Sequence, residues 1–318
     1  MQAFYLTPES LFPRGLASNT IFGAVCAVGA ELGYDIDGLI ARYLDDPPFL
    51  LSSGFPCVHH TDGTVSHFFP VPITPPYPVT TKAEYIALKA YKKVRYVGEE
   101  EFRNLCGGEI TVADLITGIG SRYHIHGGIC TADPAATDFI QGIREVPHNQ
   151  INRRSMASEQ FYHTEGAFYG SARDGLRSGL FFLAEFGDPA WEQPFTGAMR
   201  LLEDRGFGQK KSSGAGKFHL TTERFESLPQ EGRYRISLSR FIPNDLREFG
   251  EEIWYDLVSA RGRSADGVMK KQVFMLSEGT TFAASNGTAV GKVVHVRGTP
   301  PAVEYGMALT CGWEGFHG

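Results

Sequence analysis

The first thirty residues predict a strand followed by a helix that is apolar on nearly every side. Residues 2–7 favour a short strand, and Ser18-Asn19 can cap a helix that runs to about Leu32. This helix is rich in small residues such as Gly23 and Ala27, which allow it to lie close against a sheet. A strand that leads into a buried helix is typical of domains in which helices pack on a sheet.

Prolines are concentrated in residues 45–80, which hold eight of the 18 in the chain. Because proline lacks a backbone N–H, this density predicts neither a helix nor a central strand. We expect a surface insertion here that continues with mixed structure to about residue 143, including a helix near Lys82–Lys92. The eight prolines are Pro47, Pro48, Pro56, Pro70, Pro72, Pro75, Pro76 and Pro78.

The rest of the chain predicts an α+β fold in two parts. Residues 1–222 read as strand, helix, strand, strand, helix and strand, which predicts a ferredoxin-like (RRM-like) domain interrupted by the insertion at about 45–143. Residues 223–318 hold several more strand patterns and predict a second, smaller β-rich domain. Within the first part we expect a hairpin at 146–154 and 159–169, a strand at 176–186, a helix from Asp188-Pro189 to Gly206 and a strand at 217–222.

Composition places the chain among soluble proteins. Its 318 residues suggest about two domains, and its formal charge of −6 argues against a generally basic coat but not against a local basic groove. The five cysteines are scattered and odd in number, which fits reduced thiols better than a disulfide framework. The N-terminus resembles no signal peptide, and the best apolar run, Ile21–Ala30, is too short for a membrane span. We therefore expect a cytoplasmic protein that does not contact membranes.

Residues 205–217 combine four glycines, two serines and four cations without any acidic residue. Glycines allow positive φ, so successive amide N–H groups can point into one concavity and bind phosphate. The segment does not match a Walker loop, because Gly216-Lys217 is followed by Phe218. It also follows the C-terminus of a helix, whose dipole repels anions, so several phosphates of a polyanion suit it better than one buried triphosphate. A solvent-exposed basic linker and a small phosphate ligand are the alternatives.

Residues 146–154 offer a second candidate surface for nucleic acid. His148, Asn149, Gln150 and Asn152 supply hydrogen-bonding groups, and Arg153 and Arg154 supply charge. Unstacked RNA bases stack on aromatic rings and form hydrogen bonds through their edges. Rings follow closely in the sequence, so single-stranded RNA would suit this segment, whereas an ordinary edge hairpin with core aromatics is the alternative. These rings belong to Phe161, Tyr162, Phe168 and Tyr169.

Three segments together resemble the RAMP superfamily of CRISPR proteins. They are Leu11-Phe12-Pro13 with Ser18–Gly23, His148-Asn149-Gln150-Ile151-Asn152-Arg153, and Asp204-Arg205-Gly206-Phe207-Gly208 with Ser212-Ser213-Gly214-Ala215-Gly216. A weaker fourth is Tyr305-Gly306-Met307-Ala308-Leu309. Their combination is similar to the Cas5-like group within that superfamily, and more narrowly to the fourth Csm subunit of type III-A effector complexes.

The resemblance implies two ferredoxin-like domains and a non-catalytic, RNA-binding role in antiviral defence. It implies that the glycine-rich loop grips the 5′ repeat-derived tag of the crRNA. It also implies that the chain bridges the large polymerase/cyclase-like subunit and a backbone subunit, without a cofactor, a metal or a catalytic residue. The residues that would contact RNA are Arg14, Ser18, Asn19, Asn149, Asn152, Arg153, Arg154, Arg205, Gly206, Gly208, Lys210, Lys211, Ser212, Ser213, Gly214 and Gly216. Gln209 departs from the small or basic residue expected at its position, and the insertion at 45–143 matches no pattern of the family.

Two other kinds of site are alternatives to a non-catalytic RNA-binding surface. Some superfamily members are metal-independent endoribonucleases that process CRISPR repeat RNA, and His148, His163 and His219 are the candidate general acids and bases for such a stand-alone enzyme. A zinc site is a weaker alternative, because no Cys-x-x-Cys pair is present. Its possible ligands are Cys57, His59, His60, His124, His126 and Cys130.

Overall fold

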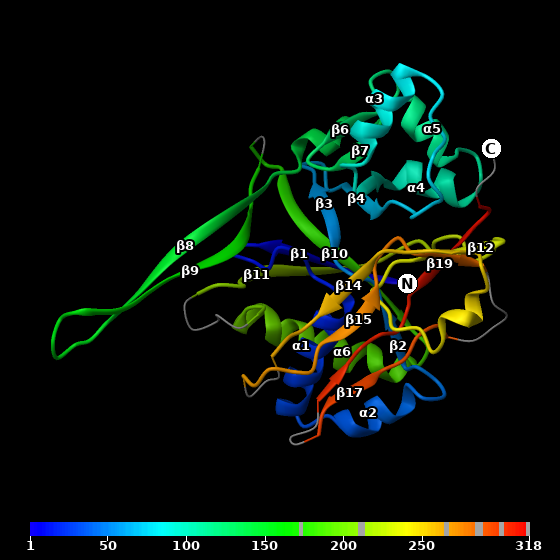
Figure 1. Ribbon diagram of the computed structural model, residues 1–318. Coiled ribbons are helices and arrows are strands. Elements are labelled where there is room, and N and C mark those ends of the chain that lie inside the picture. Colours follow the sequence, from blue (N-terminus) through cyan, green and yellow to red (C-terminus); the bar gives the residue numbers. More distant parts are fainter. Residues whose placement is uncertain (172–173, 209–213, 264–266, 284–288, 299–301, 316–318) are drawn as a thin grey trace.

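The computed structural model describes residues 1–171, 174–208, 214–263, 267–283, 289–298 and 302–315, and its fold is α+β, as predicted. Its largest sheet among these residues holds nine strands in the order β11-β1-β10-β3-β4-β5-β7-β6, with β2 paired to β10 (Figure 1). These strands are β1 Gln2–Pro8, β2 Phe49–Leu51, β3 Phe55–His59, β4 Val65–Pro70, β5 Tyr96–Gly98, β6 His124–His126, β7 Ile129–Thr131, β10 Arg177–Phe186 and β11 Phe218–Arg224.

Four strands and two helices form the centre of the molecule. β1 lies antiparallel between β10 and β11, and β10 is in turn antiparallel to β3, so these strands stand in the order β11-β1-β10-β3. The helices α1 (Ser18–Glu31) and α6 (Glu192–Arg205) pack against each other and against this sheet. Phe4 of β1 stacks on Phe182 at 5.0 Å between ring centroids and contacts Phe195 of α6 edge-on. Ile21 and Phe22 of α1 belong to the same core cluster, so the predicted apolar helix and the first strand meet in one core.

The expectation that residues 45–80 contain no central strand is wrong. β3 lies inside the sheet between β10 and β4, and it includes Pro56 opposite Leu180. The ladder from β3 to β4 begins only at Cys57, and by Phe68 the strand β4 pairs with β5 instead. Pro56 therefore sits one residue beyond the doubly paired stretch, where a missing N–H leaves that ladder intact.

The remainder of the expected insertion extends the same sheet through β5, β7 and β6 and adds a layer of helices. Its helices are α3 (Lys82–Tyr91, as predicted), α4 (Glu99–Cys106), α5 (Val112–Thr117) and the 3-10 turn η1 (Pro134–Asp138). Thr81 and Glu84 form a capping box at the start of α3, which explains where that helix begins. Phe102 of α4 stacks on Phe69 of β4 at 4.7 Å, so this layer is attached to the sheet through a buried aromatic contact.

A long two-stranded ribbon projects from the molecule (Figure 1). It consists of β8 (Gln141–Ile151) and β9 (Ser158–Tyr169), which pair antiparallel from Gln141↔Tyr169 to Ile151↔Ser158. This confirms the predicted hairpin, although β8 begins earlier than residue 146. The ribbon pairs with no strand of the main sheet among the described residues, and it is exposed along most of its length, whereas Ala167 at its base is buried.

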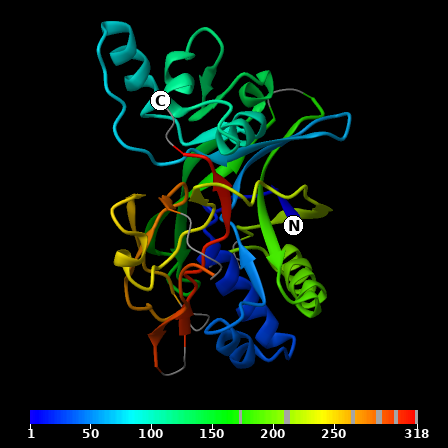
Figure 2. The same cartoon turned by 90° about the vertical axis from the view of Figure 1, so that its right-hand side faces the viewer.

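The C-terminal third, residues 223–318, is rich in short strands, as expected. It packs against both the central helices and the layer that contains α4 (Figure 2). Tyr305 stacks on Phe22 of α1 at 4.6 Å, and Cys311 lies beside Cys106 of α4. None of the described helices is long and apolar enough to cross a membrane. The remaining elements are α2 Ile36–Arg42, η2 Pro189–Trp191, η4 Leu246–Phe249, β12 Tyr234–Ser237, β13 Ile253–Trp254, β14 Leu257–Ala260, β15 Val273–Leu276, β16 Thr281–Ala283, β17 Val294–Arg297, β18 Ala302–Glu304 and β19 Thr310–Trp313.

Candidate nucleic-acid interface

The glycine-rich segment begins and ends in a closely packed backbone pair. Gly206 ends α6 with φ +85°, and the Phe207 N–H donates to the Gly216 carbonyl at 2.7 Å. Gly216 has φ +82°, and a Cβ there would lie 1.9 Å from the Phe207 carbonyl oxygen. Only glycine fits such a crossing, so these two predicted residues close the neck of the loop. Gly208 (φ +95°) and Gly214 (φ +79°) continue outward from it.

The neck of the loop is fixed to the segment that follows β1. The Gly216 N–H donates to the Leu11 carbonyl at 2.7 Å, and the Lys217 N–H donates to the Ser10 hydroxyl at 2.9 Å. Phe207 is buried, with its ring 6.1 Å from that of Phe12. The sequence analysis did not predict a role for Ser10, because a single serine in a turn forms no distinctive sequence pattern. The segment 9–14 thus acts as the platform on which the loop stands.

The same segment joins the loop to the projecting ribbon. Phe12 and Ala167 of β9 exchange two backbone hydrogen bonds, at 2.9 and 2.8 Å. Arg14 forms an ion pair with Glu165, also on β9. Gly166 between them has no room for a side chain, because a Cβ would lie 2.4 Å from Leu11 Cδ1. The structure therefore brings the loop neck, Arg14 and the base of the ribbon into one continuous surface.

The middle of the predicted loop lies outside the described residues. It comprises Gln209, Lys210, Lys211, Ser212 and Ser213. Of the predicted cations that are described, Lys217 is exposed, whereas Arg205 is paired with Glu31 of α1. An arginine that already holds a carboxylate at the surface is less available to a phosphate.

The ribbon tip presents two arginines on a turn shaped by an asparagine. The Asn152 side-chain oxygen accepts from the Arg154 N–H at 2.9 Å, and the Asn152 amide donates to Glu159. Asn149 accepts from the Ser158 hydroxyl at 2.5 Å. Arg153 and Arg154 are exposed and form no ion pair with another described residue. Asn152 therefore organises the turn, while both guanidinium groups remain open to a ligand.

Aromatic pairs lie on both faces of the ribbon. His148 stacks on Tyr162 at 5.1 Å with an interplanar angle of 16°, and its Nε2 lies 2.6 Å from the Thr164 hydroxyl. On the opposite face Phe161 meets His163 edge-on at 5.0 Å. Phe161 is 65% exposed, which is unusual for a large apolar ring. These rings offer flat surfaces on which bases could stack.

Ser18 and Asn19 are not part of this surface. Ser18 is fully buried, where its hydroxyl donates to the Arg240 carbonyl and its N–H donates to Ser53. Asn19 donates its amide to the buried carboxylate of Glu304. The expected cap at Ser18-Asn19 is also wrong, since Ala17 is the N-cap and Ser53 satisfies the first helical N–H. Both side chains are committed to the joint with the C-terminal third.

The histidines of the nuclease alternative do not come together. His148 and His163 point to opposite faces of the ribbon, because they sit at neighbouring positions of the ladder. His219 lies on β11, where its Nδ1 is 3.0 Å from Glu203. The Leu220 N–H and Arg200 also contact Glu203; although burial raises the pKa of this carboxyl, those hydrogen bonds hold it below its usual value.

No described group of three His, Cys, Asp or Glu residues could hold a metal ion. His124 and His126 of β6 are exposed and share one face of the strand. Cys130 is buried and pairs with Ile125, which points to the other face. Cys57 contacts His59 at 3.8 Å but is itself buried, and burial raises the pKa of its thiol.

Comparisons with known proteins identify the fold. No protein-family model and no curated protein matches the sequence. A chain of the Csm3-Csm4 subcomplex of the type III-A CRISPR-Cas interference complex superposes with a TM-score of 0.68 at 17% identity, over 99% of this chain and 100% of that chain. A chain of the Csm1-Csm4 cassette in complex with AMPPNP gives 0.60 at 16% identity, over 100% and 99%. The fold is therefore shared end to end. Csm4 is the component that the names of both assemblies share.

Proposed function

We propose that this chain is a Csm4-like, non-catalytic subunit of a type III-A CRISPR-Cas interference complex. In this role it holds the 5′ repeat-derived tag of the crRNA and bridges the large polymerase/cyclase-like subunit to a backbone subunit. The fold shared with chains of Csm3-Csm4 and Csm1-Csm4 assemblies supports membership in such a complex. The complex acts in the cytoplasm, as an antiviral effector guided by RNA would.

The observation that carries the RNA-binding part is the continuity of the surface. Three separate segments meet there: the neck of the glycine-rich loop, the platform 9–14 and the ribbon β8–β9. The glycine-rich loop and residues 146–154 of the ribbon were expected to bind RNA from their residue types, and Arg14 of the platform from the family resemblance. A strand lying across this surface would meet backbone amides, cations and aromatic rings in succession.

The charges suit several phosphates rather than one. The C-terminus of α6 opens the loop and its dipole is unfavourable to anions, so amides and side-chain cations must supply the attraction. Lys217 stands at one end of the surface, and Arg153 and Arg154 at the other. An extended polyanion can reach both ends, whereas a mononucleotide cannot. Gly206, Gly208, Gly214 and Gly216 would allow phosphates to approach the backbone closely.

The rings of the ribbon would add base stacking to the phosphate contacts. Each stacked base contributes about 1–3 kcal/mol and requires no particular sequence. Asn149 and Asn152 would shape the tip, and Arg14 would hold the ribbon base through Glu165. Lys210, Lys211, Ser212 and Ser213 would complete the grip from the part of the loop that lies outside the described residues.

We also propose that the chain contains two ferredoxin-like units, at 1–222 and 223–318. For the first, the chain order β1, α1, β3, β10, α6, β11 together with the spatial order β11-β1-β10-β3 supports this description. The second has a four-stranded antiparallel sheet, β13-β16-β12-β19, but among its described residues only the short turn η4 is helical.

A charge-reversal experiment tests the RNA-binding surface. The triple variant Arg153→Glu, Arg154→Glu, Lys217→Glu should bind a short RNA carrying the repeat tag at least tenfold more weakly than wild type. The dependence of log affinity on log salt should become shallower by about 2, at about 0.7 for each lost phosphate contact. Fluorescence anisotropy over a salt series measures both quantities.

A matched control comes from exposed lysines at the end of α3 and just after it. Lys89→Glu, Lys92→Glu and Lys93→Glu change the same amount of charge far from the ribbon and should leave the affinity within twofold. Equal losses in the two triple variants would mean that only overall charge matters, and the assignment would then be wrong. Lys210→Glu with Lys211→Glu extends the test to the rest of the loop.

A further inference from the structure

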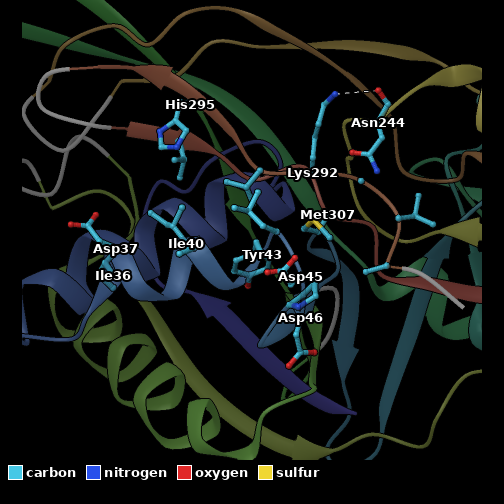
Figure 3. Close-up of a pocket in the computed structure, with 18 of the residues that line it drawn as sticks. Ile36, Asp37, Ile40, Tyr43, Asp45, Asp46, Asn244, Lys292, His295 and Met307 are labelled. Carbon is cyan, nitrogen blue, oxygen red and sulfur yellow. Dashed lines mark hydrogen bonds between the residues drawn. The ribbon is translucent and has the colours of Figure 1, made fainter.

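A pocket lies between α2 and the C-terminal third, away from the surface described above. Its volume is about 1140 Å³. Figure 3 shows its walls: α2 contributes Ile36 and Ile40, the chain after α2 contributes Tyr43 and Asp45, and the facing wall carries Lys292. In Figure 1, α2 and β17 stand at the bottom of the molecule, whereas the ribbon projects to the side. A ligand in this pocket would therefore leave the RNA surface free.

The pocket is apolar inside. Met307 and Tyr43 are almost fully buried, and four partly buried aliphatic residues also line the cavity: Ile36, Ile40, Val293 and Val303. Leu44 stands at the rim and is 83% exposed, more than any other large apolar residue among those described. Leaving a leucine in water forgoes about 2 kcal/mol of burial, so an apolar partner surface would gain by covering it.

The rim is acidic. Asp37, Asp45 and Glu248 are exposed, and no other described side chain pairs with them. Asp46 adds a fourth carboxylate, which is already 3.3 Å from Arg42. The single lysine among the lining residues, Lys292, donates to the Asn244 carbonyl at 3.3 Å. The rim thus carries an excess of negative charge, which repels nucleic acid and attracts cationic groups.

We propose that this pocket is a docking site for a protein segment that presents apolar side chains flanked by lysine or arginine, supplied by a neighbouring subunit of the complex. The apolar interior would take the aliphatic or aromatic side chains, and Asp37, Asp45 and Glu248 would pair with the flanking cations. The existence of neighbouring subunits rests on the proposed function. The chemistry of the segment rests on the pocket itself, through its apolar walls and its acidic rim.

Site-specific cross-linking inside the assembled complex identifies the occupant. Leu44 is replaced by a photoreactive benzophenone amino acid, which an 83% exposed position tolerates, and the cross-linked peptides are sequenced by mass spectrometry. We expect one dominant adduct with a lysine- or arginine-bearing apolar segment of another subunit. Adducts with a second copy of this chain, adducts with RNA, or solvent quenching alone would each overturn the proposal.

Charge reversal measures how much the acidic rim contributes to the affinity for the partner subunit. Asp45→Lys with Glu248→Lys should weaken binding of the cross-linked subunit at least tenfold, and reversing the cations of its segment to glutamate should restore it. Glu109→Lys with Glu226→Lys is the matched control, since both carboxylates are exposed and lie outside the pocket. Equal effects of the two double variants would contradict the assignment.

Failure of this proposal can be told apart from failure of the proposed function. The rim variants should bind tag RNA as wild type does, because the pocket lies away from the ribbon. The RNA-surface variants should in turn keep their affinity for the cross-linked subunit. If no subunit binds at all while RNA binding is intact, the bridging role fails; if subunits bind but the rim variants do not weaken them, only the docking site fails.

Discussion

Gly216 shows how one residue sets the geometry of the candidate RNA surface. Its φ is +82°, and a Cβ would lie 1.9 Å from the Phe207 carbonyl oxygen. Gly216→Ala therefore combines the cost of a left-handed conformation, about 1–2 kcal/mol, with a direct clash that the backbone must relieve. We expect a loss of at least about 3 kcal/mol in the free energy of unfolding, measured by urea denaturation, together with weaker RNA binding.

Gly214 provides the control for conformation without the clash. Its φ is +79°, and a Cβ there would meet no atom of another described residue within 4 Å. Gly214→Ala should cost only about 1 kcal/mol, the penalty of the backbone conformation alone. If the two variants lose the same stability, the close crossing at Phe207 is not what requires glycine at position 216.

At the residue scale, the sequence predicted most residues of the candidate surface but not the long-range contacts that hold its segments together. Glycines and cations at 205–217 have a recognisable composition, and so do the amides and arginines at 149–154. Ser18 and Asn19 were misplaced because a polar residue at a helix start looks the same whether it caps the helix or binds a buried partner. Their partners lie far away in the sequence, and a local sequence pattern does not predict such contacts. These partners are Ser53, Arg240 and Glu304.

At the scale of elements, a polar chain attaches α4 to the central sheet. The Tyr5 hydroxyl of β1 lies 2.9 Å from His67 Nε2, and His67 Nδ1 lies 2.8 Å from Glu99 on α4. Arg103 contacts the other oxygen of Glu99 at 2.8 Å. Burial raises the pKa of Glu99, but the hydrogen bonds and charges of His67 and Arg103 outweigh burial and hold it below its usual value.

This depressed pKa makes the attachment of α4 sensitive to acid. The folded state prefers ionised Glu99, so the contribution to stability is full above the unfolded pKa of about 4.3 and is lost as pH falls through the lower folded pKa. Glu99→Gln should therefore lower the urea midpoint at pH 7, and the gap from wild type should shrink between pH 5 and pH 3. Glu100→Gln, at an exposed neighbouring position, should show no such convergence.

Elements were predictable where local patterns decide them and not where pairing decides them. The helices α1, α3 and α6, the strands β1, β10 and β11, and the ribbon follow from periodicity, caps and turn residues. β3 was missed because Pro56 argues against a central strand, and only the register of β4, which begins at Cys57, makes that proline harmless. Such a register depends on a partner strand, which the sequence of β3 alone does not reveal.

At the scale of the whole molecule, the two expected domains share their cores. Phe22 and Tyr43 from the first part pack with Tyr305 from the last, and Phe102 and Leu105 of α4 belong to the same cluster as Cys311 and Trp313. Burial raises the pKa of Cys311 far above its usual value, so its thiol 3.9 Å from Cys106 stays protonated. These contacts join the two parts into one packed body, with the candidate RNA surface on one side and the acidic pocket on another.

A buried ion pair where the two parts meet allows a test of whether they unfold together. Lys270 lies 2.6 Å from Glu304, which is 3% exposed and also accepts from Asn19 of α1. Lys270→Met leaves that carboxylate buried without its cation and should cost about 3–5 kcal/mol of unfolding free energy. Adding Glu304→Gln removes the unpaired buried charge and should recover more than half of the lost unfolding free energy.

The control is an exposed ion pair. Arg233→Met breaks the pair with Glu252 and should cost less than about 1 kcal/mol of unfolding free energy. Denaturation followed by fluorescence should show a single transition throughout; a second transition in Lys270→Met would mean that the parts fold independently.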